Sequence, residues 1–324
     1  MTLSRRLRSG VRTIVGEVQA RRVARAGSPI IGFAHLVGDP RADGPRASLA
    51  VDSLLREIAW LRGLGYSFVP LEAILAYLVE GSPPSRAFHL VFDDGFRPVY
   101  TEAYPPLRAA GIPFSVALVE ESFRGRGLLW PDELALRIRA NRGRLPEINA
   151  LAPDLVEVEG VSAAGTPQYR RNRLKKVQNG DRLEFMERLR GLCPELDRRE
   201  AEHLEALRPA EAAELRRNGV ELLSHTRSHP ILSRVEGHDA LAREVEPWDT
   251  SLLRSDVLVY PNGRPEDVDD RVFSAMRRAG VEFGLTTIRG LVRREANPFL
   301  LPRISAAGRL ADLRGEFALL SRRL

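Results

Sequence analysis

The sequence predicts an α/β fold, a distorted parallel (β/α) barrel of about seven strands with an insertion and helical extensions. Short apolar runs alternate with segments of helical apolar spacing along most of the chain, which is typical of repeated βα units. Titratable side chains follow directly after several of these runs, as they do at the carboxyl ends of barrel strands. Since 44% of the 324 residues are hydrophobic, the chain can bury a substantial core in one domain.

The barrel domain is predicted at residues 27–308. Its first half lies before residue 121. An apolar stripe predicts its first helix, which Gly63 and Gly65 end, and the stripe consists of Val51, Leu54, Leu55, Ile58 and Leu61. The other elements of this half are strands at 29–37, 66–69, 88–92 and 114–118, one helix from Leu71 and one that ends at about Ala110.

The stretch from about residue 121 to 205 departs from this alternation and is predicted as an insertion. It is rich in Arg, Glu and Pro, and Pro131 is well placed to start a helix that runs to about Arg139. Regular alternation then returns, with helices at 209–218, 240–253 and 266–279 and strands at 220–224, 256–260 and 281–287.

Amphipathic helices are predicted at both ends of the barrel. Residues 1–26 hold seven arginines and one acid, with apolar residues at helical spacing from Leu3 to Val18. This helix either lies on an anionic membrane surface or packs against the outside of its own domain. The tail, residues 309–324, is predicted as a second amphipathic helix.

Composition limits which partners and which cellular compartment we expect for this protein. The net charge of +6 is spread along the chain, so nucleic acid is not an expected partner. The single Cys193 excludes a disulfide framework and is expected to be a packing residue. Apolar runs of about 18 residues and a secretory signal are both lacking, so we expect a cytoplasmic protein, with peripheral contact at the inner membrane face if residues 1–26 bind lipid.

Two motifs predict a metal site. Asp93, Asp94 and Gly95 follow an apolar strand, and His225 and His229 are four residues apart in Ser224-His225-Thr226-Arg227-Ser228-His229-Pro230, a spacing that brings both rings to one face of a helical turn. Two histidines and a carboxylate hold a divalent ion while leaving a coordination position for water, which is typical of hydrolases. One of the two acids can bind the ion while its neighbour handles protons.

With these motifs the sequence resembles the polysaccharide deacetylases with the NodB homology domain, carbohydrate esterase family 4, from Ile30 to Ile304. Val91-Phe92-Asp93-Asp94-Gly95 is similar to the first family motif, the Ser224–Pro230 segment to the second, and Leu258-Val259-Tyr260-Pro261-Asn262-Gly263 to the third. The resemblance implies a NodB-type barrel and an enzyme that removes an acetyl group from an N-acetylated sugar of a polysaccharide, an oligosaccharide or a glycan precursor.

The resemblance also implies roles for individual residues. Asp93 is then the general base, and Asp94, His225 and His229 hold the metal, with zinc expected and cobalt, nickel or manganese as alternatives. The family's late histidine has no counterpart, because the last histidine of the chain is His238. We expect His35 to replace it, since His35 resembles the early histidine of the biofilm poly-N-acetylglucosamine deacetylases.

Three further residues are weaker candidates. The third motif lacks the arginine that orients the catalytic acid in the family, and Arg303 is expected to supply an equivalent guanidinium. Trp130 is a candidate sugar platform, and a backbone N–H near Tyr260 is a candidate contact for the reaction's oxyanion. A catalytically inactive glycan-binding barrel and a deacylase of a non-sugar amide remain as alternative functions.

Overall fold

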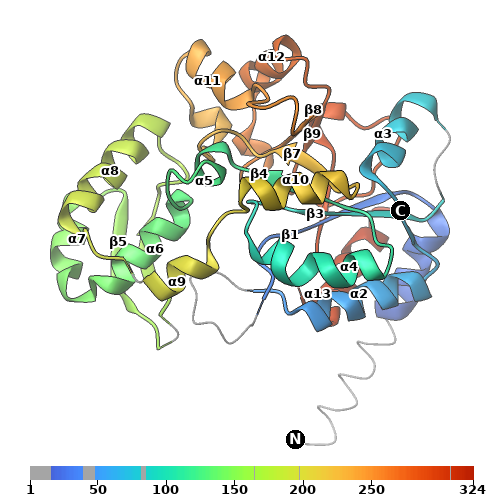
Figure 1. Cartoon of the computed structure of the whole chain (residues 1–324), viewed down its shortest axis with the longest axis horizontal. Helices are drawn as coiled ribbons and strands as arrows, with labels where there is room; N and C mark the ends of the chain where they lie inside the picture. Colours follow the sequence, from blue (N-terminus) through green and yellow to red (C-terminus); the bar gives the residue numbers. More distant parts are fainter. Residues whose placement is uncertain (1–15, 39–47, 82–84, 164, 197, 307) are drawn as a thin grey trace, which may run out of the picture.

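One parallel sheet of eight strands forms the centre of the molecule, in the order β10-β1-β3-β4-β7-β8-β9 with β2 paired to β3 (Figure 1). The computed structural model describes residues 16–38, 48–81, 85–163, 165–196, 198–306 and 308–324. The strands are β1 (Ile30–Ala34), β2 (Ser67–Phe68), β3 (Ala87–Phe92), β4 (Phe114–Leu118), β7 (Glu221–Ser224), β8 (Arg254–Val259), β9 (Phe283–Leu285) and β10 (Ile304–Ser305). The sheet curls into a distorted (β/α) barrel, which confirms the predicted fold class.

The chain between β9 and β10 joins the two ends of this curled sheet. Leu301 pairs with Leu285 at the end of β9, and three residues later β10 pairs with β1 through Gly32 and Ile304. Arg303 lies in this short crossing, with its backbone N–H bonded to the Ile288 carbonyl. The crossing therefore carries a side chain from the last part of the sequence to the rim formed by the first strands.

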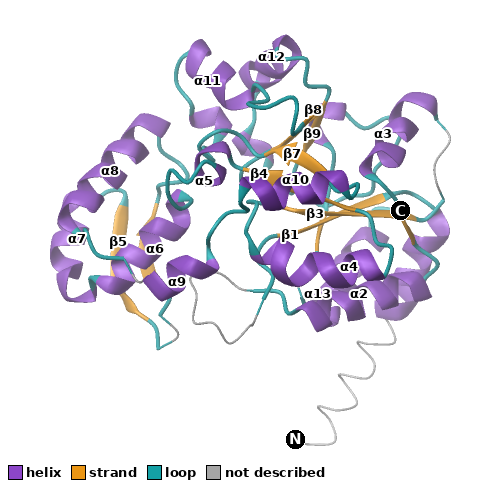
Figure 2. Cartoon of the chain, viewed as in Figure 1, coloured by secondary structure: helices purple, strands orange, loops and turns teal. Residues whose placement is uncertain are grey.

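Helices cover the sheet on its outside (Figure 2). They are α2 (Val51–Gly63), α3 (Leu71–Glu80), α4 (Tyr104–Ala109), α5 (Glu120–Phe123), α10 (Pro209–Arg217), α11 (His238–Val245), α12 (Asp270–Arg278) and α13 (Leu310–Ser321). Every residue of β3 and β4 is buried, so these strands are continuous apolar runs, as expected of parallel strands covered on both faces.

Three predicted helices are shorter than the sequence suggested. The helix expected at 266–279 divides at Asp269, whose carboxylate accepts the N–H groups of Arg271 and Val272 and so caps α12. The helix before Ala110 divides into a π-helical turn (Val99–Ala103) and α4, which has proline in its first turn. The helix expected at 240–253 ends at Val245.

The insertion has its own apolar core and its own small sheet. It contains α6 (Trp130–Ala140), α7 (Leu145–Leu151), β5 (Val156–Val161), β6 (Pro167–Asn172), α8 (Asn179–Leu192) and α9 (Arg198–His203), with β5 and β6 antiparallel. Its core is built from α6, α7, β5 and α8, and the buried Cys193 packs into it as a small apolar residue. The sequence predicted neither this core nor the hairpin.

Residues 16–26 form a helix that packs on the barrel. Ala20, Val23 and Ala24 are buried in the main core, and Glu17 accepts a hydrogen bond from the Trp60 indole. Val18, which the predicted apolar stripe included, is 63% exposed. The rest of that predicted helix, residues 1–15, lies outside the described residues. Within the described part of the chain, none of the helices combines the length and apolarity needed to cross a bilayer.

Glu57 on α2 predicts a pH-dependent stability. Burial raises the pKa of this carboxyl from 4.5 to about 7, so the folded state favours the protonated form, and that stability is lost as the pH rises from 4.5 through 7. We expect Glu57→Gln to be more stable than the wild type at pH 8 by about 3 kcal/mol and nearly equal to it at pH 4.5. Denaturant unfolding at both pH values measures this, with the exposed Glu80→Gln as the control.

If the difference in unfolding free energy between Glu57→Gln and the wild type is the same at both pH values, Glu57 is not the group whose titration changes the stability.

Candidate active site

The candidate side chains gather at one rim of the barrel, at the carboxyl ends of the strands. His35 follows β1, Asp93 and Asp94 follow β3, His225 follows β7 and Tyr260 follows β8. A cavity of about 530 Å³ opens among them. It is lined by Phe33, His35, Asp93, Asp94, Trp130, Pro131, Asp132, Lys175, His225, His229, Ile231, Tyr260, Asn262, Arg264 and Thr287. Parallel barrels carry their chemistry at this rim.

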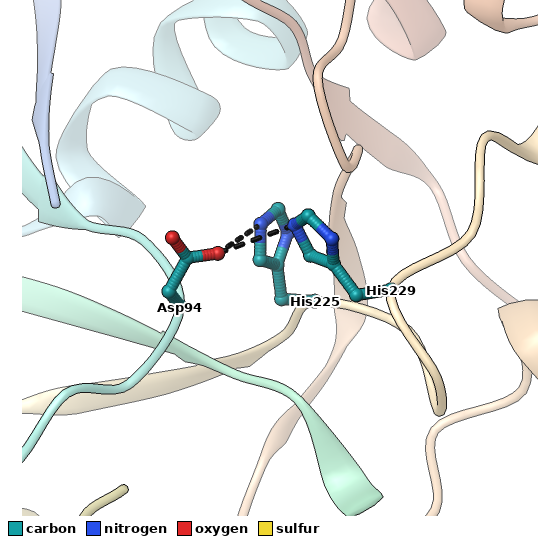
Figure 3. Close-up of side chains that lie close together, drawn as sticks. All are labelled: Asp94, His225 and His229. Carbon is teal, nitrogen blue, oxygen red and sulfur yellow. Dashed lines mark ion pairs between the residues drawn. The ribbon is translucent and has the colours of Figure 1, made fainter. Parts of the chain in front are cut away.

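Asp94, His225 and His229 form a compact cluster on one side of this cavity. The Asp94 Oδ1 atom lies 3.3 Å from Nε2 of His225 and 3.2 Å from Nε2 of His229. Figure 3 shows the carboxylate directed at both imidazole rings. One potential ligand atom from each residue lies within 4.8 Å of the other two, and all three residues are buried. The structure thus brings Asp94 together with two histidines that follow it by more than a hundred residues of chain.

The spacing of the two histidines had suggested a helical turn. In the structure both histidines lie on a loop instead, and their side chains approach the same point. The segment after β7 contains two residues in the left-handed region, Thr226 at φ 68° and His229 at φ 56°. Asp94 is also left-handed, at φ 73°. Such conformations are rare for residues with a Cβ and are found where surrounding contacts impose them, often at functional sites. The loop conformation, rather than helical periodicity, directs both rings at Asp94.

The donor set fits a divalent metal ion. Nδ1 of His225 lies 2.7 Å from the Val259 carbonyl oxygen, a contact that requires the proton on Nδ1 and leaves Nε2 with its lone pair. Ligating histidines are commonly held by such a bond from the second ring nitrogen. Two imidazoles and one carboxylate are the protein ligands of several catalytic zinc sites. The residues that would hold the ion are therefore Asp94, His225 and His229.

Asp93 is held by a buried, bidentate ion pair. Nη1 and Nη2 of Arg303 each lie 2.8 Å from one carboxylate oxygen of Asp93, and Nε of Arg303 donates to the Thr286 carbonyl. Both side chains are nearly inaccessible to solvent. Burial raises the pKa of Asp93, but the Arg303 guanidinium outweighs it and keeps the pKa below its ordinary value. Asp93 is therefore an oriented carboxylate beside the metal cluster.

His35 lies on the open side of Asp93. Its Nε2 atom is 4.0 Å from Asp93 Oδ2, and the side chain is 40% exposed in the cavity. The ring packs edge-on against Phe33, over which the Arg303 guanidinium also lies. His35 is therefore within reach of both the acid and a molecule bound in the cavity.

Tyr260 and Trp130, the two aromatic candidates, form walls of the cavity rather than open platforms for a sugar ring. The Tyr260 hydroxyl donates to the Phe299 carbonyl, and its backbone N–H donates to the Leu285 carbonyl. Because that N–H is already bonded, any oxyanion contact from this segment must use another N–H. Trp130 is 7% exposed, and its indole N–H donates to the His229 carbonyl. It therefore supports the metal-ligand loop as well as lining the cavity.

Several cavity residues were not predicted from the sequence, and Asp132 and Lys175 are two of them. Asp132, in the first turn of α6, is 2% exposed although it lines the cavity. Lys175, in the loop after β6, donates to the side chain of Asn262 and so ties the insertion to the third motif. The Trp130-Pro131-Asp132 sequence carried a signal for Asp132, since an acid after a helix-starting proline is well placed at a rim. Nothing near Lys175 indicated its position.

Glu244 on α11 fixes the loop between the two histidines. Its carboxylate accepts the backbone N–H groups of Arg227 and Ser228, each at 3.0 Å, and the Ser228 hydroxyl at 2.6 Å. We expect Glu244→Ala to weaken metal affinity by about 10- to 100-fold, as is usual when an outer support of a ligand is lost. Metal titration measures this, and Glu236→Ala, at an exposed position two residues before α11, serves as the control.

Equal metal affinities of Glu244→Ala and the wild type would show that the loop holds its shape without this carboxylate.

Solved structures that resemble this fold include several deacetylases. The structure resembles the Streptococcus pyogenes deacetylase PplD in complex with acetate, with a TM-score of 0.56 at 16% identity over 89% of this chain and 96% of that one. It also resembles IcaB from Ammonifex degensii, with a TM-score of 0.53 at 15% identity over 91% and 97% of the two chains. A polysaccharide deacetylase from Bacillus cereus gives a TM-score of 0.51 at 13% identity over 90% of this chain and 69% of that one.

A sequence relative points in the same direction. The chain is 38% identical over 76 residues to the poly-beta-1,6-N-acetyl-D-glucosamine N-deacetylase of Escherichia coli (strain K12), a match that takes in 23% of this chain and 11% of that protein. No family model matches the sequence. The relative fits the biofilm subgroup to which the early His35 had pointed. The chain therefore has the fold of the polysaccharide deacetylases, which confirms the resemblance that its motifs predicted.

Proposed function

We propose that this protein is a metal-dependent hydrolase that removes the acetyl group from an N-acetylated sugar. The observation that carries the proposal is the Asp94, His225 and His229 cluster beside the Arg303-bound Asp93, in a cavity at the barrel rim. Metal ligands, an oriented carboxylate and an accessible histidine are the parts that amide hydrolysis requires. The deacetylases that share the fold support the choice of an acetyl group.

Each residue has a distinct task in this reaction. A divalent ion bound by the cluster would polarise the acyl oxygen and lower the pKa of the attacking water. Asp93 takes the proton from that water, because Arg303 holds its carboxylate ionised and in one orientation. His35 then gives a proton to the departing sugar nitrogen, so that the amide and water become an amine and acetate. Trp130 and Tyr260 close the cavity around the acylated sugar.

Release of acetate from a short oligomer of N-acetylglucosamine tests the proposed reaction. We expect zinc-loaded protein to release acetate together with a free sugar amine, and metal-depleted protein to release neither until zinc, cobalt, nickel or manganese is restored. Binding of the oligomer without any release would instead support the glycan-binding alternative. Release of acetate only from amides that are not sugars would support the second alternative.

His35→Gln tests the role of the early histidine. We expect kcat to fall by about 10²- to 10⁴-fold, the usual contribution of a general acid, while metal content stays unchanged. The loss should be smaller on an acetyl ester, because its leaving alcohol needs less help from an acid than an amine does. His238→Gln, at an exposed position on α11, is the matched control. Equal losses on ester and amide would argue against proton donation by His35.

We also propose that the enzyme works in the cytoplasm and contacts the inner membrane face through the basic residues at 1–26. The charge of this segment supports the proposal, because arginines attract anionic headgroups. Removal of residues 1–15 leaves the packed helix at 16–26 in place, so the truncated protein should remain folded. Membrane fractionation of both forms tests the contact, and an unchanged distribution would refute it.

A further inference from the structure

A second cavity, of about 500 Å³, lies beside the active site and shares one wall with it. Trp130 lines both cavities, and Ser228 lines the second one next to the metal-ligand candidate His229. The other walls come from the α5 end, the following loop, α6 and α8. The proposed reaction uses only the first cavity. A ligand that extends past Trp130 would enter the second.

Arg182 on α8 is the central charged group of the second cavity. The residue is 3% exposed, and its guanidinium lies 4.9 Å from the centre of the Trp130 ring. Nη2 donates to the side chain of Asn179, a neutral partner, while Nε is buried and has no hydrogen-bond partner among the residues that the structure describes. Burial lowers the pKa of Arg182 to about 10, so it remains cationic at neutral pH. A buried donor without an acceptor carries a cost that a bound anion would offset.

The remaining charges of this cavity also favour an anion. Its lining contains four arginines, Arg126, Arg137, Arg182 and Arg190, and two acids, Glu121 and Glu133. Glu133 is already bonded by both Arg137 and Arg190, so this group of three retains a surplus positive charge.

The other acids near Arg182 offset its charge only in part. Burial, and then the negative charge of Glu244, raises the pKa of Glu121, which weakens its ionised form. Glu244 itself is engaged by the loop at Arg227 and Ser228.

We propose that this second cavity binds an anionic group, a carboxylate or a phosphate, carried by the sugar next to the one that is deacetylated. Arg182 is the principal contact, with Arg126 at the exposed edge. The guanidinium fork suits both anions, since each presents two oxygens to parallel N–H donors. The inference rests on the proposed function for the connection between the two cavities, while the anion site itself depends only on the geometry around Arg182.

Kinetics on paired substrates test the connection. The first substrate is a disaccharide of N-acetylglucosamine and a uronic acid. The second is the same disaccharide with the neutral hexose in place of the uronic acid, and the third carries a phosphate on that hexose. We expect the wild type to have a KM about tenfold lower for an acidic substrate than for the neutral one. Arg182→Gln and Arg126→Gln should each reduce this ratio, and the exposed Arg278→Gln on α12 should keep it. A ratio of one in the wild type overturns the inference.

The substrates that carry a uronate or a phosphate identify the anionic group, because the favoured anion gives the larger KM ratio.

Arg182→Lys separates binding from structure. It keeps the positive charge but loses the fork, so it should restore part of the ratio that Arg182→Gln loses. If Lys and Gln at this position lower the ratio equally, the fork is essential. If neither changes the ratio, Arg182 does not bind the anion and the inference is wrong.

Fluorescence titration provides a readout that does not need catalysis. Three tryptophans are present, and Trp130 is the one stacked with Arg182. We expect glucuronate or inorganic phosphate to change the emission of the metal-depleted full chain, and both Arg182→Gln and Trp130→Phe to abolish the change. An Arg182-dependent signal in a protein that releases no acetate would refute the proposed function and keep the anion site. Acetate release without that signal would support the proposed function and refute the anion site.

Discussion

Asp93→Asn is expected to lose about 10²- to 10⁴-fold in kcat while still binding metal. The amide has the size of the carboxylate but cannot accept the proton of the attacking water. The proposed metal ligands are Asp94, His225 and His229, so the metal content should stay that of the wild type. Acetate release and metal analysis of the same preparation measure the two quantities separately.

The same substitution should also lower stability. Arg303 is fully buried and pairs with both oxygens of Asp93, so a neutral side chain at 93 leaves its charge without a counter-ion. Breaking a buried pair from one side typically costs about 3–5 kcal/mol. Asp239→Asn, at an exposed position in the first turn of α11, controls for the loss of one carboxylate. If Asp93→Asn kept wild-type turnover, another residue would have to be the base.

The fold was predictable where burial on both faces makes a strand visible as an apolar run. The strand at Phe114–Leu118 was predicted with its observed bounds, and β3 was predicted to within one residue. The hairpin of the insertion was not predicted because β6 is mostly polar, with Gln168, Arg170, Arg171 and Asn172 among its six residues. Its pairing depends on the β5 strand and on the local core, which composition does not reveal.

The metal site was predictable from residue types, but its geometry was not. Two histidines four residues apart suggested a helical turn, whereas the structure uses a loop in which Thr226 and His229 are left-handed. Glu244, 16 or 17 residues further along the chain on α11, accepts the N–H groups of Arg227 and Ser228 in this loop. Periodicity describes only local geometry, so it cannot indicate a loop shaped by a partner on another helix.

Arg303 illustrates the opposite case, in which topology made a distant contact predictable. It is 210 residues from Asp93 in sequence, yet the last segment of a barrel must return to its first strands. Arg303, in the segment that follows the last predicted strand at 281–287, was therefore expected to supply a guanidinium at the rim. The sequence did not determine that the contact would be bidentate or completely buried, because those properties depend on the packing of Phe33 and Thr286 around the guanidinium.

Asp94→Asn is expected to remove metal binding, and with it both turnover and metal-dependent stability. Its carboxylate oxygen lies within 3.3 Å of both imidazole nitrogens and provides the only negative charge among the three predicted ligands. The loss in affinity should exceed the roughly 10- to 100-fold expected for a supporting residue such as Glu244. A ligand at about 100 times its Kd stabilises a folded protein by about 2.7 kcal/mol.

Thermal unfolding with and without zinc measures this linkage without any substrate. The wild type should show a higher Tm with zinc, and Asp94→Asn should show the same Tm in both conditions. Because the carboxylate and the two histidines are buried together, the variant without metal should fold at least as well as the wild type without metal. A zinc-dependent rise in Tm that survived in Asp94→Asn would place the metal at other residues, and the roles given to His225 and His229 would fall with it.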